Sequence, residues 1–134
     1  MSRLKPGATG KFSIVVDESH LASSAGNIGV DVLATPMITV LFESAASDAL
    51  LPVMKDGEIS VGTRILVRHF KPTPPGLKVE ATVKLREVAG IKYLFDVEVY
   101  DEVELVADGE IERAIIDSDR FYRSVDEKRK PIPA

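Results

Sequence analysis

The fold is decided by residues 35–52, which read TPMITVLFESAASDALLP. The segment is apolar with few interruptions, and Thr35 is a suitable N-cap for a helix. Pro36 follows at the first helical position, where its missing N–H costs nothing, and Pro52 ends the helix. The second half is rich in Ala and Ser, whose small side chains let a sheet approach closely. We therefore predict one long central helix around which the rest of the chain packs.

Strand patterns flank this helix on both sides. Residues 11–18 predict a first strand, and residues 19–32, rich in Ser and Gly, predict a loop or flexible lid. After the helix, four long segments rich in Val and Ile alternate in polarity, which predicts four meandering strands. One antiparallel sheet around one helix is an α+β architecture. We expect residues 1–134 to form a single domain with a charged tail that frays from about 120. The four strands are expected at 59–70, 77–88, 92–100 and 104–116.

The composition excludes several classes of protein. A net charge of −4 argues against a nucleic-acid binder, because phosphate contacts need clustered Lys and Arg. The absence of cysteine excludes disulfides and a Cys nucleophile, and it suits a cytoplasmic chain. No segment approaches the ~20 apolar residues of a membrane span, so we expect no membrane association. The two histidines, His20 and His69, come without a clustered ligand pattern, so no metal is expected.

Three polar side chains stand out because they border or interrupt apolar surfaces. Glu43 is the first charge on the central helix, where half-burial would raise its pKa toward that of a general base. Alternation over 59–69 places four aliphatic side chains on one strand face, which His69 continues. With the hydroxyl of Thr35 at the helix entrance, these are components for acid–base or nucleophilic catalysis. The four aliphatic residues are Ile59, Val61, Ile65 and Val67.

Helix geometry leaves the choice of hydroxyl open. Thr35 and Glu43 lie roughly 12 Å apart along an ideal helix axis, which is too far for a direct hydrogen bond. Thr39 is one turn from Glu43 on the same face, and sequence physics alone slightly favours it. Each residue also has an ordinary structural explanation. Thr35 can be only a helix cap, Glu43 a solvent-facing charge, and His69 a satisfied histidine at a strand end.

A set of short motifs runs through nearly the whole chain. They are Ala34-Thr35-Pro36-Met37, Glu43-Ser44-Ala45, Ser60-Val61-Gly62-Thr63, His69, Thr73-Pro74-Pro75-Gly76-Leu77 and Glu-Arg-Ala-Ile-Ile at 112–116. In type and mutual spacing this set resembles the fluoroacetyl-CoA thioesterase-like family of hot-dog proteins. The resemblance implies a hot-dog fold, in which one long antiparallel sheet wraps around a central helix.

The resemblance also implies an activity and a site. It implies an acyl-CoA thioesterase with a catalytic set of Thr35, Glu43 and His69, and oxyanion binding by the backbone of Gly62. It implies a homodimer, or a dimer of dimers, with the pocket at the subunit interface and CoA only as part of the substrate. A second oxyanion donor is expected at the helix start, at the N–H of Met37 or its neighbour. Unlike the fluoroacetyl-specific relatives, this chain has no aromatic residue in its lid, so we expect no fluoroacetyl selectivity.

Two mechanisms and two other functions stay open at this point. Thr35 attacks the thioester with His69 as base, or Glu43 or His69 activates water. The alternatives are a non-catalytic acyl-CoA binding protein and a hot-dog enoyl-CoA hydratase, although no histidine lies between Leu21 and Arg68 to serve a hydratase. The candidates for binding the CoA phosphates are Arg64, Arg68, Lys71, Lys78, Arg120, Arg123, Lys128, Arg129 and Lys130.

Overall fold

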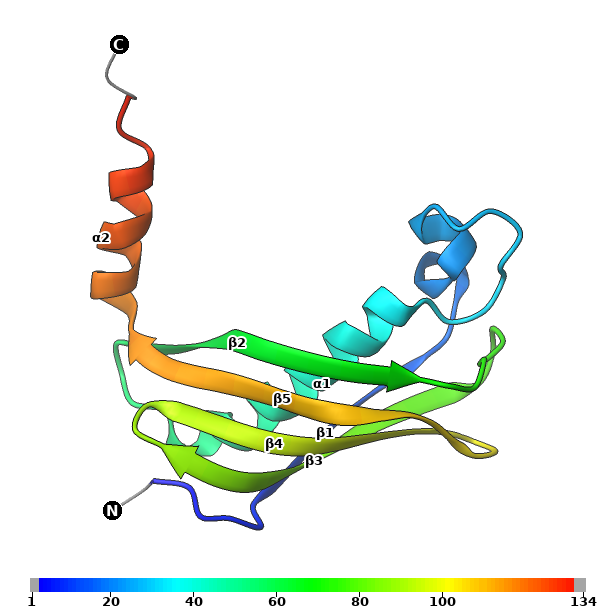
Figure 1. The fold of residues 1–134 in the computed structure, drawn as a ribbon, viewed down its shortest axis with the longest axis horizontal. Coiled ribbons are helices and arrows are strands. Elements are labelled where there is room, and N and C mark those ends of the chain that lie inside the picture. Colours follow the sequence, from blue (N-terminus) through cyan, green and yellow to red (C-terminus); the bar gives the residue numbers. More distant parts are fainter. Residues whose placement is uncertain (1–2, 132–134) are drawn as a thin grey trace.

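Helix α1 (Thr35–Leu50) packs against one face of a curled antiparallel sheet (Figure 1). The computed structural model describes residues 3–131 and orders the five strands β1-β3-β4-β5-β2. This confirms the predicted α+β hot-dog architecture, with strand ends within two residues of those expected after the helix. The strands are β1 (Thr9–Val15), β2 (Glu58–His69), β3 (Lys78–Ala89), β4 (Lys92–Asp101) and β5 (Leu105–Asp117).

The position of β2 differs from the predicted meander. Strands β3, β4 and β5 are sequential neighbours, but β2 pairs with β5 and forms an edge of the sheet. The Pro-rich segment after β2 therefore crosses the end of the sheet instead of making a hairpin. Thr73 anchors this crossing because its buried hydroxyl donates to Asp101 at 3.0 Å. Its carbonyl accepts the N–H of Leu33 at 2.9 Å, which ties the crossing to the lid.

The inner face of α1 forms the centre of the core. Its buried residues recur every three or four positions, as expected for one face of a helix. With the following 3₁₀ turn (Leu51–Val53), which contains Pro52, the helix is long and apolar enough to cross a membrane by length and composition. Its apolar face is instead covered by the sheet. The buried residues of α1 are Ile38, Leu41, Phe42, Ala45, Ala46, Ala49 and Leu50.

Two structures project from opposite ends of the sheet (Figure 1). At one end, residues 18–34 form the lid, with 3₁₀ helices Glu18–His20 and Ala22–Ala25 in place of the irregular loop that we expected. At the other end, helix α2 (Ser118–Lys128) extends past β2. The prediction that the tail frays from about 120 is wrong, because Asp117 caps this helix by accepting the N–H of Arg120. Residues 132–134 lie outside the described residues.

Gly10 of β1 sets how closely the sheet approaches α1. A Cβ atom at this position would lie 2.4 Å from the carbonyl oxygen of Ala45 and 2.7 Å from the amide nitrogen of Ala49. Both atoms belong to the backbone of α1, so the helix itself would have to move. We predict that Gly10→Ala lowers the free energy of unfolding by about 1–3 kcal/mol through this overpacking. Chemical denaturation measures the change, and exposed Ser13→Ala on the same strand is the control. Equal stability of the two variants would contradict the prediction.

Candidate active site

A hydrogen bond joins the start of α1 to the end of β2. Oγ1 of Thr35 lies 2.9 Å from Nδ1 of His69, which is 34 positions away in the sequence. Ala34 is the N-cap of α1, and no side chain caps the helix. The prediction that Thr35 is the cap is therefore wrong, because Thr35 already belongs to the helix and its hydroxyl contacts the imidazole instead. Of the two candidate hydroxyls, Thr35 and not Thr39 is the one bound to His69.

This contact gives a hydrogen-bond partner to only one of the two ring nitrogens of His69. Burial lowers its pKa from the ordinary value of 6.5, and the backbone of Lys71 opposes this only in part. The ring is therefore neutral at pH 7 and can accept a proton. Its Nε2 atom is buried and has no hydrogen-bond partner among residues 3–131. When Thr35 donates to Nδ1, the ring proton resides on Nε2, and a buried N–H without an acceptor is costly.

Thr35 and His69 line a cavity of about 270 Å³ between the lid and the end of β2, which we call the Thr35 pocket. The lid supplies aliphatic side chains and one amide, and the segment after β2 supplies an aromatic and a cationic side chain. None of the lid residues in this wall is aromatic. The wall residues that bear on the argument are Ala22, Asn27, Val30, Phe70 and Lys71.

A β-bulge determines which part of β2 faces α1. The pairing with β5 shifts between Gly62 and Arg64, so Thr63 is an extra residue in β2. The bulge reverses the alternation, because opposed residues of antiparallel strands share a face. Ile59 and Val61 therefore lie on the outer face, and the prediction that they share a face with the end of the strand is wrong. The row that shares the face of the core residues of β5 is Ser60, Gly62, Ile65, Val67 and His69.

Glu43 lies in a second cavity, of about 190 Å³, beside the bulge. This Glu43 pocket is lined by Gly62, Ile65 and Ile111, and it shares no residue with the Thr35 pocket. A Cβ atom on Gly62 would lie 3.1 Å from Oε1 of Glu43, so the glycine leaves this carboxylate accessible. Glu43 is exposed in the single chain, which corrects our expectation that it is half-buried.

Arg113 of β5 is a member of this site that the sequence analysis missed. Its side chain is buried and donates to the carbonyl oxygen of Ser60 at 2.8 Å and to the Ser60 hydroxyl. Burial lowers the pKa of Arg113, and the negative charge of Glu43 opposes that effect. A Cβ atom on Gly62 would lie 3.7 Å from Nη1 of Arg113. A carboxylate and a guanidinium therefore both lie close to the position that a side chain of residue 62 would occupy. In the sequence, the signal available for Arg113 was a charge between Ile111 and Ile115 of β5.

The basic side chains divide into paired and unpaired groups. On the sheet, Arg64 pairs with Glu110 and Arg68 with Asp108, at 2.9 and 2.7 Å. These arginines are already neutralised by their neighbours. Within the described part of the chain, four of the candidate phosphate ligands take part in no ion pair. They are Lys71, Arg120, Arg123 and Lys128.

The single chain thus brings together some of the predicted residues and separates others. Thr35 and His69 are in contact, whereas Glu43 and Gly62 form a separate pocket on the same face of the sheet. The N–H of Met37 donates to the carbonyl of Ala34 at 3.0 Å, so it is not available to an oxyanion in this structure.

Comparisons with known proteins identify relatives over most of the chain. A family model of fluoroacetyl-CoA-specific thioesterases matches residues 16–119. The fluoroacetyl-CoA thioesterase of Streptantibioticus cattleyicolor is 39% identical over 98 residues, which is 73% of this chain and 70% of that protein. This is the family that the sequence motifs resemble.

Solved structures agree in fold. A fluoroacetyl-CoA thioesterase superposes with a TM-score of 0.87 at 30% identity, covering 96% of this chain and 98% of the other. Its threonine-to-serine mutant in complex with acetyl-CoA gives a TM-score of 0.88 at 30% identity, covering 95% and 100%. A thioesterase superfamily member from Thermus thermophilus, at 24% identity, shares the fold with a TM-score of 0.83 and covers 92% and 94%.

The buried imidazole makes a prediction about titration. We expect His69 to titrate below pH 6.5, because desolvation disfavours its charged form. Two-dimensional NMR of the histidine ring signals measures the midpoint, and a His20→Gln variant assigns the two resonances. A midpoint for His69 at or above 6.5 would contradict the burial on which its role as a base depends.

Proposed function

This chain is a thioester hydrolase of the fluoroacetyl-CoA-specific thioesterase family, and on that premise we propose that it hydrolyses short acyl-CoA thioesters at a site completed by a second copy of the chain. The observation that carries the proposal is the Thr35–His69 pair with its unpartnered, buried Nε2. A nucleophile and a base are in place, but the acceptor that should orient the imidazole is missing from the same pocket. The carboxylate of Glu43 lies exposed in the neighbouring pocket.

The free edge of β2 supports a homodimer as the means of joining the two pockets. The strand is 12 residues long and carries exposed Ile65 and Leu66, a combination that single-chain proteins avoid at a sheet edge. Two copies related by a twofold axis would pair these edges antiparallel, which brings the first half of one strand beside the end of the other. The Glu43 and Gly62 of one subunit then approach the His69 of its partner.

In the mechanism that we propose, Thr35 attacks the thioester carbonyl and transfers its proton to Nδ1 of His69. The Glu43 of the partner subunit accepts from Nε2 and stabilises the imidazolium. The backbone of Gly62 is the proposed donor to the oxyanion, since the absence of a side chain lets the carbonyl come close. The CoA thiolate leaves with little acid assistance, because a thiol pKa is about 8.5. The departing thiolate takes the proton from the imidazolium, which restores the neutral imidazole. That imidazole then accepts a proton from the attacking water and returns a proton to the Thr35 oxygen as the acid is released.

Direct attack by water is the second mechanism, with Thr35 only positioning the substrate. The 2.9 Å contact between Oγ1 of Thr35 and Nδ1 of His69 favours the first mechanism, because the base is already within hydrogen-bonding distance of the hydroxyl. An acyl group on Thr35, detected by mass spectrometry during a single turnover, distinguishes the two. No observation in the structure favours a hydratase or a non-hydrolysing binding protein. The cytoplasm stays the expected location.

The lid leads to a prediction about substrate preference. The side chains that it contributes to the Thr35 pocket are aliphatic apart from the amide of Asn27, so none is an aromatic group that distinguishes fluorine from hydrogen. We predict that the chain releases CoA from acetyl-CoA and fluoroacetyl-CoA with kcat/KM values within about tenfold of each other. A thiol reagent measures the release, and the chain has no cysteine to react with it. No release from either substrate would contradict the proposed function. A strong preference for fluoroacetyl-CoA would contradict only the lid argument.

The shared site makes a prediction about mixed dimers. We expect the homodimers of Glu43→Ala and of His69→Ala each to lose about 100-fold or more in kcat. A heterodimer with one copy of each variant keeps one intact site, so it should regain about half of the wild-type rate. Two different affinity tags allow the heterodimer to be isolated and its thiol release measured.

The reciprocal heterodimer is the matched control. It combines a wild-type subunit with one that carries both Glu43→Ala and His69→Ala, and each of its shared sites lacks one residue. We expect it to be inactive. The opposite pair of results, an active control and an inactive first heterodimer, would show that each site lies within one subunit.

A further inference from the structure

Beyond its cap at Asp117, helix α2 makes few contacts with the rest of its own chain. It has 11 residues and none of them is buried, although isolated helices of this length are marginal in water. Phe121 and Tyr122 form an edge-to-face ring pair at 5.2 Å, and Tyr122 is 55% exposed. An amphipathic helix with an exposed tyrosine and few contacts along most of its length is suited to lie against a second surface.

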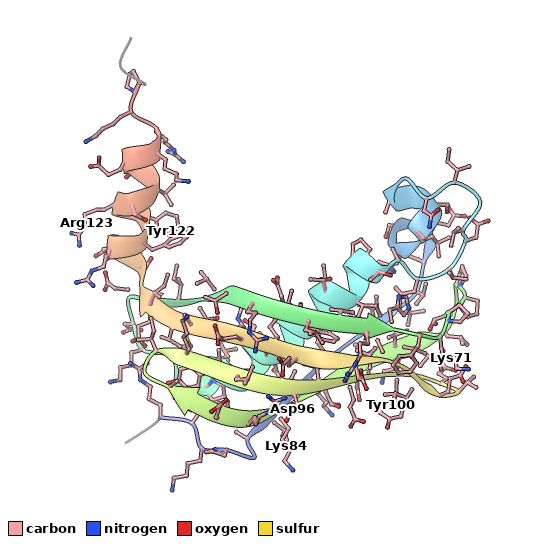
Figure 2. All side chains as sticks on the ribbon, in the orientation of Figure 1. Lys71, Lys84, Asp96, Tyr100, Tyr122 and Arg123 are labelled. Carbon is pink, nitrogen blue, oxygen red and sulfur yellow. The ribbon has the colours of Figure 1, made fainter. Side chains whose placement is uncertain are left out.

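The strand pairing indicates where that surface is. Helix α2 begins after Asp117, which pairs with Glu58 at the first residue of β2. In an antiparallel pair of β2 strands, this end lies beside the partner's strand end, where His69 and Lys71 line the Thr35 pocket. Figure 1 shows α2 extending past the β2 edge, which is the edge at which a second copy would pair. In Figure 2, Lys71 and Arg123 of one chain lie at opposite ends of the sheet.

The charges of α2 are uneven in a way that suits a phosphate ligand. Its later acids, Asp126 and Glu127, pair with Arg129 and Lys130. Asp119 lies in the first turn, where the helix dipole favours an acid. The remaining bases, Arg120, Arg123 and Lys128, take part in no ion pair within residues 3–131.

A groove at the base of α2 offers room for the rest of a nucleotide. It has a volume of about 410 Å³, and its walls include Ile91, Ile115 and Phe121. Arg120 lines the same groove. Asp117 is the acid in its wall, and its carboxylate is engaged in capping the backbone N–H of Arg120. Apolar walls beside an arginine suit a flat heteroaromatic ring that carries phosphates.

We infer that α2 of one subunit forms the CoA-binding wall of its partner's active site. The adenosine end of CoA occupies the groove at the base of α2, and Arg120 and Arg123 bind its phosphates. The acyl end enters the partner's Thr35 pocket, past the partner's Lys71. This inference rests on the proposed function, because it requires both a dimer paired through β2 and a CoA thioester.

A kinetic experiment tests the role of the two arginines. The double variant Arg120→Gln/Arg123→Gln should raise KM for acetyl-CoA about tenfold or more and leave kcat little changed. It should leave kcat/KM unchanged for S-acetyl-N-acetylcysteamine, a thioester that has no phosphates. Lys84→Gln, which removes one exposed charge from β3 (Figure 2), is the control and should change neither substrate. An equal loss on both substrates, or no loss on either, would overturn the inference.

Cross-linking tests the position of α2 independently of activity. The chain has no cysteine, so Lys71→Cys/Arg123→Cys introduces the only two thiols. Because these positions lie at opposite ends of the sheet in one chain (Figure 2), we expect oxidation or a short bismaleimide to join two copies into a covalent dimer. The control pair, Lys84→Cys/Arg123→Cys, should stay monomeric on a denaturing gel. Equal cross-linking of both pairs, or of neither, would overturn the placement of α2.

The two experiments separate failure of this inference from failure of the proposed function. Wild-type protein that hydrolyses neither thioester would contradict the proposed function, whereas the cross-link would still report where α2 lies. Wild-type protein that hydrolyses both, with an arginine variant that does not discriminate between them, would contradict the inference alone.

Discussion

The close contact between α1 and the sheet is the constraint on which the site depends. At Gly10 the backbone of β1 comes so near to the helix that a single methyl group would collide with helix backbone atoms. Such packing leaves α1 little freedom to slide or rotate. The helix start is therefore held at the end of β2, where Thr35 meets His69. Two turns further along, the same rigid helix presents Glu43 to the bulge at Gly62.

The bulge and the edge position of β2 convert an ordinary strand into part of a site. One extra residue, Thr63, brings Gly62 and Ser60 to the face that α1 covers, and Arg113 is then satisfied by Ser60. The result is that a buried guanidinium and a carboxylate both lie close to the position that a side chain of residue 62 would occupy. Because the strand edge is free and apolar residues are exposed along it, the proposed dimer places this group beside the imidazole of a partner.

The basic side chains of β2 and those of α2 differ in whether they have acidic partners. The arginines of β2 are neutralised by carboxylates on the adjacent strand, which stabilises the outer surface modestly. Among the candidate phosphate ligands in residues 3–131, those without such a partner are Lys71 and three bases of α2, at opposite ends of one chain (Figure 2). In the inferred dimer these opposite ends meet, so one substrate contacts both. A division of this kind explains why a domain of 134 residues needs no deep pocket of its own.

Local signals in the sequence were sufficient to predict the helix and the strands and to select the Thr, Glu and His candidates. Periodicity and turn residues depend on neighbours in the chain, so the sequence shows them directly. The motif spacing was sufficient to identify the family. Tertiary structure alone decided that Thr35 contacts His69 instead of capping its helix, and that β2 is an edge. It also decided that Ile59 and Val61 face outward and that Arg113 belongs to the site. The physical reason is that a one-residue bulge reverses every later side chain in a strand, and that a hydroxyl or guanidinium takes its partner from residues brought near only by folding.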